Sequence, residues 1–468
     1  MSKVSDEQKR EERYLKITTG RIYPLLVKMA IPSMVGMIVA TVYNMTDTFW
    51  VGKLNDATLT ASVGVVFTFV SIIQAIGFWF GYGSGNYVSR MLGKKELEKA
   101  EEMASTGVLL GILVGIVMAV AGVFLLRPMA VLMGAGSSEE LMDATIRYLR
   151  ITVCSVPFML TSNVIYNELR LAGAGGSSMI GLLVGMAANM ILDPVLILTA
   201  GLGIEGAAWA SFCGQVLGVA VLYAGTKRGG NVRITLSKAK LNLQHLREIL
   251  AGGAPNFCRQ GISSISSVLL NHVAGAFGVT AIAAVTIATR VLYIAYALVI
   301  GFGQGFQPIC AMNYGAGKLS RIKKAFGMTL LTVTCFLVVS AIALLYFREG
   351  LVSAFTTEKE VARLAVSMLE IWCIILPFMG YYILIGMLLQ NIGRFGLATS
   401  VTTLENGFCF IPSLLICCHF WGVDGLTWCK PVASLASLLI SLCIGTYAWR
   451  KYLNASERKE KDEVRIAV

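Results

Sequence analysis

Charged residues are scarce in this sequence. They make up 14% of its 468 residues, whereas an ordinary soluble domain carries about 25%. Hydrophobic residues reach 56%, and the mean hydropathy is +0.70. A chain of this composition has too little polar surface to cover an ordinary globular core. Composition therefore predicts an integral membrane protein.

The sequence also lacks the short motifs of several other protein classes. It has no Walker A loop, no HExxH helix and no glycine-rich dinucleotide fingerprint. Its 11 cysteines lie mostly in apolar segments without the paired spacing of a zinc site, so we interpret them as packing residues. The 3 histidines are scattered and have no acid beside them. We therefore expect neither an enzyme nor an ATP-driven pump, and no organic cofactor.

Long apolar segments take the place of these motifs. About twelve of them have the ~20 residues needed to cross a bilayer, the first at 25–51 and the last at 424–448. Several contain Gly or Pro, which membrane helices tolerate because neighbouring helices can satisfy the freed carbonyl groups. The sequence thus predicts an all-α membrane fold of about twelve transmembrane helices.

Basic residues are distributed unevenly around these segments. The formal net charge is +12, and most Lys and Arg residues fall at the two ends of the chain, near 226–248, and in the loops after every second apolar segment. An excess of this kind marks the cytoplasmic side of a membrane protein. We therefore expect a multi-pass protein of the cell membrane with both termini in the cytoplasm, and no nucleic-acid partner.

An internal repeat organises the chain. "AIPS" at 30–33 corresponds to "GAPN" at 253–256, and "VPFM" at 156–159 corresponds to "LPFM" at 376–379. Since the matches keep the same order, they predict two copies of one six-helix unit. An even number of helices in each copy implies a pseudo-two-fold axis along the membrane normal. The predicted parts are a cytoplasmic segment at 1–23, lobes at 24–225 and 249–448, a basic cytoplasmic linker at 226–248, and a cytoplasmic tail at 449–468.

Several motifs together resemble one transporter family. The chain combines "TDTFWVG" in the first segment, "NMILDP" in the fifth, and the paired "PFM" segments. With this layout it is similar to the multidrug and toxic compound extrusion family of cation-coupled antiporters. The resemblance implies a secondary exporter of amphipathic organic cations. It also implies alternating access of two lobes, driven by inward flow of protons or sodium, with membrane lipids around it.

The first half of the chain carries the candidate coupling residues. Asp47 lies inside an apolar segment, where a charge costs at least ~2.5 kcal/mol and therefore has a partner or a function. Asn189 and Asp193 are four residues apart, hence on one helix face. Pro194 deprives the Met190 carbonyl of its helical partner. The resemblance adds Asp47 and Ser211 to this cluster, as a proton site or as a sodium site at Asp47, Asn189 and Asp193.

Simpler interpretations of these acids remain open. Asp47 could serve only as a hydrogen-bond partner between helices. The "LDP" sequence at Asp193 could be a turn that ends a helix near the membrane surface.

The second half differs from the first. The neighbourhoods "QGISSIS" and "PFMGYYILIG", where some members of the resembling family carry carboxylates, contain none. Its apolar segments hold four other charged residues: Arg259, Arg290, Glu405 and Lys430. The favoured interpretation is a structural ion pair of Glu405 with Lys430 or Arg290. Contact with substrate stays open, as does a flippase for lipids or lipid-linked precursors, whose phosphates would need a basic cavity.

Overall fold

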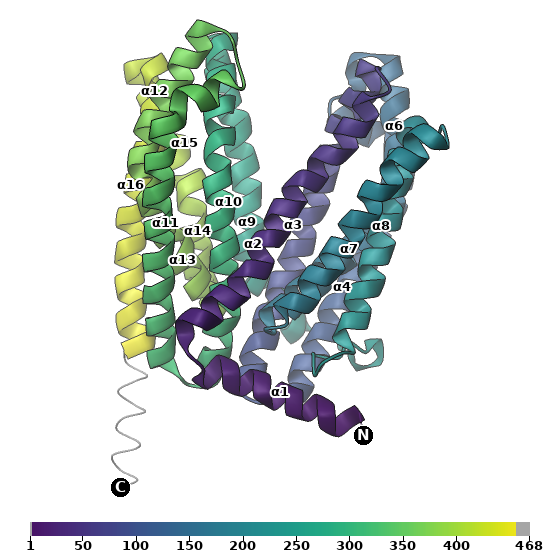
Figure 1. Ribbon diagram of the computed structural model, residues 1–468, viewed down its shortest axis with the longest axis vertical. Helices are drawn as coiled ribbons and strands as arrows, with labels where there is room; N and C mark the ends of the chain where they lie inside the picture. The colour runs from purple at the N-terminus through teal and green to yellow at the C-terminus, as the bar shows by residue number, and fades with distance from the viewer. Residues whose placement is uncertain (1, 455–468) are drawn as a thin grey trace. The chain divides into compact units, whose positions relative to one another are not determined.

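The computed structural model describes the backbone of residues 2–454 (Figure 1). The side chains of residues 2–5, 41–45, 47 and 48 lie outside the described part of the chain, as does the segment 455–468. Asp47 is therefore described only as a residue within helix α2 (Ile22–Gly52). The last 14 residues of the predicted cytoplasmic tail at 449–468 also lie outside the description.

Helices account for all the regular structure of residues 2–454, and they fall into two compact units. Helix α2 and helix α9 (Leu243–Ala276) each contribute to both units. The first unit otherwise contains α1 (Ser2–Thr19), α3 (Ala57–Gly93), α4 (Leu97–Phe124), α5 (Leu126–Leu132), α6 (Glu139–Leu171), α7 (Gly175–Pro194), the π-helical turn η2 (Val195–Thr199) and α8 (Gly203–Thr226). The second otherwise contains α10 (Val279–Gly315), α11 (Leu319–Ser353), α12 (Lys359–Ile375), α13 (Met379–Asn391), α14 (Phe395–Thr403), the π-helical turn η5 (Leu404–Phe408), α15 (Phe410–Trp421) and α16 (Val423–Ala448).

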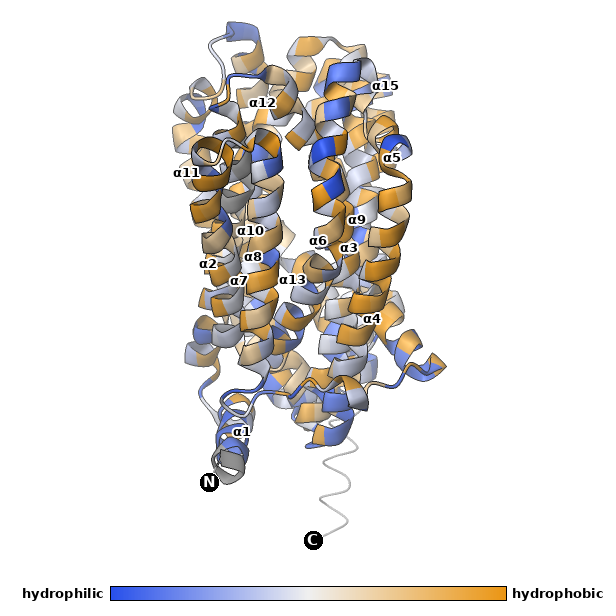
Figure 2. Ribbon diagram, turned by 90° about the vertical axis from the view of Figure 1, so that its right-hand side faces the viewer, coloured by the Kyte–Doolittle hydropathy of each residue, from blue (hydrophilic) through white to orange (hydrophobic). Residues whose placement is uncertain are grey.

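The described residues include 11 helical segments that are long and apolar enough to cross a membrane. Figure 2 shows hydrophobic residues along the middle of these helices and hydrophilic residues toward their ends. The twelfth expected segment, 249–275, lies in α9, which has 34 residues. That length suffices to span a bilayer, but the polar residues of α9, Arg259 and His272 among them, make it less apolar than the others. The all-α membrane fold is confirmed.

Helices α2 and α9 are each divided between the two units. The first unit takes residues 1–19 and 35–253, and the second takes 20–34 and 254–468. Each lobe therefore includes the beginning of a helix whose remainder belongs to the other lobe. Close contacts of glycines show that these exchanged segments pack within their units. In the first unit, a Cβ on Gly83 of α3 would meet the backbone of Ile249 in α9, and in the second, a Cβ on Gly305 of α10 would meet the backbone of Ala30 in α2. The predicted bounds place 24–52 of α2 in the first lobe and 249–276 of α9 in the second, with the beginning of α9 in the linker 226–248.

The repeat is visible in the helix bounds. Helices α3 and α10 both have 37 residues and begin at Ala57 and Val279. Gly173 follows α6 with φ +77°, and Gly393 follows α13 with φ +78°. This left-handed conformation suits glycine, which has no Cβ to clash. The two units thus repeat the same succession of helices and the same turn.

The predicted linker is packed against the first unit. Val232 and Ile234 are buried, and the Thr235 amide donates to Ser105 Oγ on α4 at 3.0 Å. Nearby, the Lys238 ammonium contacts the Glu101 carboxylate of α4 at 2.6 Å. Because Glu101 keeps only 6% of its surface exposed, this ion pair lies partly out of water. The segment is therefore anchored structure of the first lobe.

We predict that Lys238→Met destabilises the protein by about 1 to 3 kcal/mol, since it leaves the Glu101 carboxylate buried without its cation. The matched control is Lys99→Met, which removes an exposed ion pair to Glu96 on the surface of α4. Thermal unfolding of the purified protein checks the difference. Equal unfolding temperatures for the two variants would show that the Lys238 pair contributes nothing.

Candidate functional site

Three polar side chains predicted from the sequence meet in the first unit. Asn189 and Asp193 of α7 are 1% and 0% exposed. The Asn189 Nδ2 donates to Ser211 Oγ of α8 at 3.0 Å and, more weakly, to Asp193 Oδ1 at 3.4 Å. One amide therefore joins the carboxylate of α7 to the hydroxyl of α8.

Glycines bring the two helices close enough for this contact. A Cβ on Gly214 of α8 would lie 2.7 Å from the carbonyl oxygen of Gly185 on α7, and a Cβ on Gly185 would lie 2.9 Å from the Gly214 carbonyl oxygen. Small residues at a helix crossing let the backbones approach each other. Since Ser211 lies three residues before Gly214, this crossing places its short side chain within reach of Asn189.

The chain beyond Asp193 does not end the membrane helix. Pro194 is the last residue of α7, and η2 continues as a π-helical turn in which the Ala200 amide donates to the Val195 carbonyl at 2.8 Å. The helical segment reaches Thr199, so the interpretation of "LDP" as a turn that ends the helix is wrong. Proline and π turns both loosen the regular hydrogen-bond ladder. Met190 lies four residues before Pro194, where a proline removes the partner of its carbonyl.

This cluster can hold a small cation or a proton. It offers a carboxylate, a hydroxyl and an amide oxygen, which are hard oxygen ligands. Among the described residues, Asn189 Oδ1 is a buried acceptor with no hydrogen-bond partner, so a donor or cation beside it would relieve a desolvation cost. The side chain of Asp47 lies outside the described residues, and its place in the cluster stays a prediction.

A second charged cluster lies inside the second unit, around the π turn η5. Glu405 is in this turn, where the Cys409 amide donates to the Leu404 carbonyl at 2.8 Å. The Ser266 hydroxyl of α9 donates to the Asn406 carbonyl. Helix α9 thus contacts the turn directly and brings its own polar residues toward Glu405.

Lys430 contacts an aromatic ring rather than forming a close ion pair. Its Nζ lies 4.2 Å from the centre of the Trp372 ring. Trp372 is fixed because its Nε1 donates to the Thr427 carbonyl at 2.8 Å. That carbonyl is free to accept, since its usual partner four residues later is Pro431, which has no N–H. A proline in α16 thus orients the ring beneath the ammonium.

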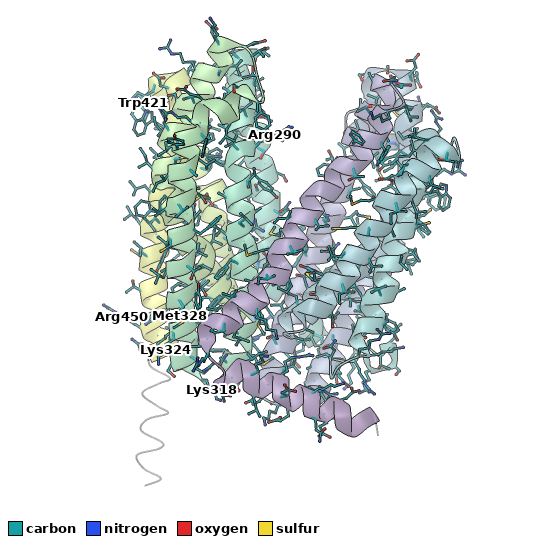
Figure 3. The ribbon with its side chains drawn as sticks, viewed as in Figure 1. Arg290, Lys318, Lys324, Met328, Trp421 and Arg450 are labelled. Carbon is teal, nitrogen blue, oxygen red and sulfur yellow. The ribbon has the colours of Figure 1, made fainter. Side chains whose placement is uncertain are left out.

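The remaining basic residues of this half occupy different environments. Arg259 Nη1 of α9 donates to Tyr296 Oη of α10 at 3.1 Å. The charges of Arg259 and Lys430 both act on Glu405. Arg290 is exposed on α10 (Figure 3). The structure therefore brings Glu405, Arg259 and Lys430 into one cluster and leaves Arg290 apart from it.

One buried acid was missed in the sequence. Glu168 of α6 is 3% exposed and accepts a hydrogen bond from Ser84 Oγ of α3 at 2.6 Å. Gly107 of α4 makes room for it, because a Cβ there would lie 2.6 Å from Glu168 Oε1. The reasoning that singled out Asp47, a carboxylate inside an apolar segment, would have identified Glu168 as well. Trp372 and Tyr296 carry no comparable sequence signal.

Comparison with known proteins agrees with this architecture. A family model described as MatE matches residues 32–195 and 255–415, one stretch in each half of the chain. Multidrug export protein MepA of Staphylococcus aureus (strain MSSA476) is 26% identical over 451 residues, which cover 96% of this chain and 99% of MepA.

Solved structures share the fold. A MATE protein in the bent conformation matches with a TM-score of 0.87 and 22% identity, over 95% of this chain and 98% of that chain. A MOP superfamily transporter from Pyrococcus furiosus Vc1 (DSM3638) matches with a TM-score of 0.85, the same identity and the same coverage. At this level of identity, the likeness extends to the fold alone.

We predict that Gly214→Ala destabilises the protein by about 1 to 3 kcal/mol, because the added methyl group overpacks the crossing of α7 and α8. Gly176→Ala on α7 is the control, since a Cβ there meets nothing within 4 Å. Thermal unfolding of the purified variants measures the effect. An unchanged unfolding temperature for Gly214→Ala would mean that the helices can separate at no cost.

Proposed function

Because the chain belongs to the MATE family of multidrug efflux transporters, we propose that it exports amphipathic organic cations in exchange for protons or sodium ions. The protein is a multi-pass membrane transporter and not an enzyme. The coupling ion, the charge of the substrate and the direction of exchange belong to the proposal.

The observation that carries the proposal is the buried cluster of Asn189, Asp193 and Ser211. An acid inside a membrane helix is costly, and it commonly marks the pathway of an ion or a proton. Here the acid is fully buried beside a bonded amide and hydroxyl. A proton on Asp193 or a sodium ion among these oxygens would neutralise the site, and its release would restore a negative charge that attracts a cationic substrate. Substrate and coupling ion would then exclude each other.

Alternating access of the two lobes would convert this exclusion into transport. If the lobes open to the outside, the coupling ion displaces the substrate there, and if they open to the inside, the substrate displaces the ion.

The side of the membrane on which the substrate is released depends on how the protein is oriented in the membrane. In the second unit, Lys318, Lys324 and Arg450 lie at one end and Trp421 at the other (Figure 3). The basic end suits the cytoplasm, so we infer that both termini are cytoplasmic in the cell membrane.

Uptake of ethidium by inverted membrane vesicles tests this function. Acidifying the vesicle lumen, or loading it with sodium, supplies the gradient that drives exchange. We expect ethidium to accumulate only when one of these gradients is present. Absence of gradient-driven uptake by a folded protein would contradict the proposal and would favour the flippase alternative, which transport of a fluorescent anionic lipid would then reveal.

We predict that Asp47→Asn abolishes ethidium transport and leaves the protein inserted and folded. The amide keeps the shape and hydrogen bonding of the side chain, but it cannot exchange a proton or offer a full charge. The matched control is Asp56→Asn, an exposed residue that caps α3 through the amides of Thr58 and Leu59, because asparagine caps a helix equally well. Cellular resistance to ethidium at equal expression is the measurement. Full resistance with Asp47→Asn would refute a coupling role.

We predict further that Asp193→Asn and Asn189→Ala impair the same step as Asp47→Asn, so a combined variant loses little more than the most impaired single one. Residues that act as a unit give strongly non-additive losses. Initial rates of gradient-driven ethidium uptake by the single and combined variants decide this. Losses that multiply would show that α7 acts independently of Asp47.

A further inference from the structure

One end of the second unit is basic and contains no acid. Three segments meet there: residues 311–328 at the turn from α10 to α11, residues 387–400 at the turn from α13 to α14, and residues 442–454, which end α16 and form the π-helical turn η6 (Trp449–Asn454). Phe326 packs against Trp449 with 5.7 Å between the ring centres. Together the three segments hold seven Lys and Arg residues and no Asp or Glu. This end of the unit therefore attracts anions.

Two tyrosines position three of these cations. The Arg394 guanidinium lies 3.9 Å from the centre of the Tyr452 ring, and the Lys451 ammonium lies 5.6 Å from the same ring centre. Lys451 also donates to Tyr447 Oη at 2.6 Å. Among the described residues, Arg394, Arg450 and Lys451 make no ion pair within 4.0 Å. The tyrosines thus orient the positive charges but do not neutralise them.

A cavity lies beside these cations on the exposed face of α16. Its volume is about 690 Å³, and it is lined by Leu442, Cys443, Thr446, Tyr447, Arg450 and Lys451. Small-ligand sites measure about 300 to 1,000 Å³. The exposed side chains of Leu435 and Leu439 continue the same helix face away from the basic end, because steps of three or four residues keep to one face. The cavity therefore joins a basic end to an apolar stripe, as a ligand with a charged head and an apolar tail requires.

We propose that this cavity binds an anionic phospholipid, whose phosphate is held by Arg450 and Lys451 and whose acyl chains lie along the exposed leucines of α16. The membrane span that contains these residues ends at Asn454, which places them at the depth of lipid headgroups. Basic pockets at this depth bind anionic headgroups, and the arginine fork matches two phosphate oxygens. A soluble anion would leave the apolar stripe unused. The lipid is a fixed ligand of the second unit and contacts neither the Asp193 nor the Glu405 cluster, so the inference is independent of the proposed function.

A second cavity in the same unit provides the contrast. It lies between α11 and α12, has a volume of about 420 Å³, and is lined by Arg363 together with Glu349 and Glu370. The Glu370 carboxylate contacts the Arg348 guanidinium at 2.8 Å. Two acids beside one lining arginine disfavour a phosphate. Arg363 is exposed, so it is a matched control for Arg450: an exposed arginine that lines a cavity of the same unit but has acids around it.

Native mass spectrometry of the delipidated full-length protein tests the proposal. The probes are phosphatidylglycerol and phosphatidylcholine with the same acyl chains. We expect the first phosphatidylglycerol to bind about tenfold more tightly than phosphatidylcholine. Combining Arg450→Gln with Lys451→Gln should remove this preference by weakening phosphatidylglycerol alone. Arg450→Lys should retain it, because the charge remains, and Arg363→Gln should leave both affinities unchanged.

Measurements on the unaltered protein cover the case in which the double variant does not fold. Phosphatidylglycerol should raise the unfolding temperature more than phosphatidylcholine does, since a ligand stabilises the state that binds it. Glycerol phosphate, which has the headgroup charge without the acyl chains, should not displace the lipid. Three results would overturn the inference: equal affinities for the two lipids, an unchanged preference in the folded double variant, or displacement by glycerol phosphate, which would indicate a site for soluble anions.

Discussion

The structure depends on the absence of water inside a bilayer. A polar group at that depth must find its hydrogen-bond partners within the chain. Three examples show the consequence. Asn189 bonds Ser211 and Asp193, Glu168 bonds Ser84, and Trp372 bonds the Thr427 carbonyl that Pro431 leaves free. Each polar group thereby fixes the position of a neighbouring helix, so the few polar residues also determine how the apolar helices pack.

Irregular helices supply the geometry that a regular helix could not. In the first unit, Asp193 stands immediately before Pro194 and the π turn η2. In the second, Glu405 lies within the π turn η5. A π turn inserts an extra residue into the hydrogen-bonding pattern and changes the direction in which the following side chains point. Both candidate clusters therefore lie where the membrane helices depart from regular geometry, and in the first the close contact of Gly185 with Gly214 brings its two helices together.

Much of the first cluster could be predicted because it depends on local rules. A spacing of four residues places Asn189 and Asp193 on one helix face, and the family resemblance supplied Ser211. The second cluster could not be predicted in the same way. Matching residues through the repeat says nothing about the rotation of a helix, so it could not reveal that Lys430 lies over Trp372. The π turns also lie at different places in the two halves. Gly173 corresponds to Gly393 in the repeat, but η2 begins at Val195, 22 residues after Gly173, whereas η5 begins at Leu404, only 11 residues after Gly393.

The division of α2 and α9 between the units escaped prediction for a related reason. It depends on contacts between residues far apart in sequence, such as Gly83 with Ile249 and Gly305 with Ala30. Hydropathy identifies a helix but not the lobe against which each of its turns packs. The chain therefore passes between the two units at three places: between residues 19 and 20, within α2 near Pro32, and within α9 near Pro255.

The central claim is that the cluster at Asp193 binds substrate and coupling ion in mutual exclusion. Its most direct test is the affinity of the purified protein in nanodiscs for ethidium, measured as the proton or the sodium concentration is raised. The account predicts that one of these two ions weakens ethidium binding by about tenfold in the unaltered protein, and that Asp193→Asn removes this dependence. Ethidium affinity that is independent of both ions in the unaltered protein would contradict the account.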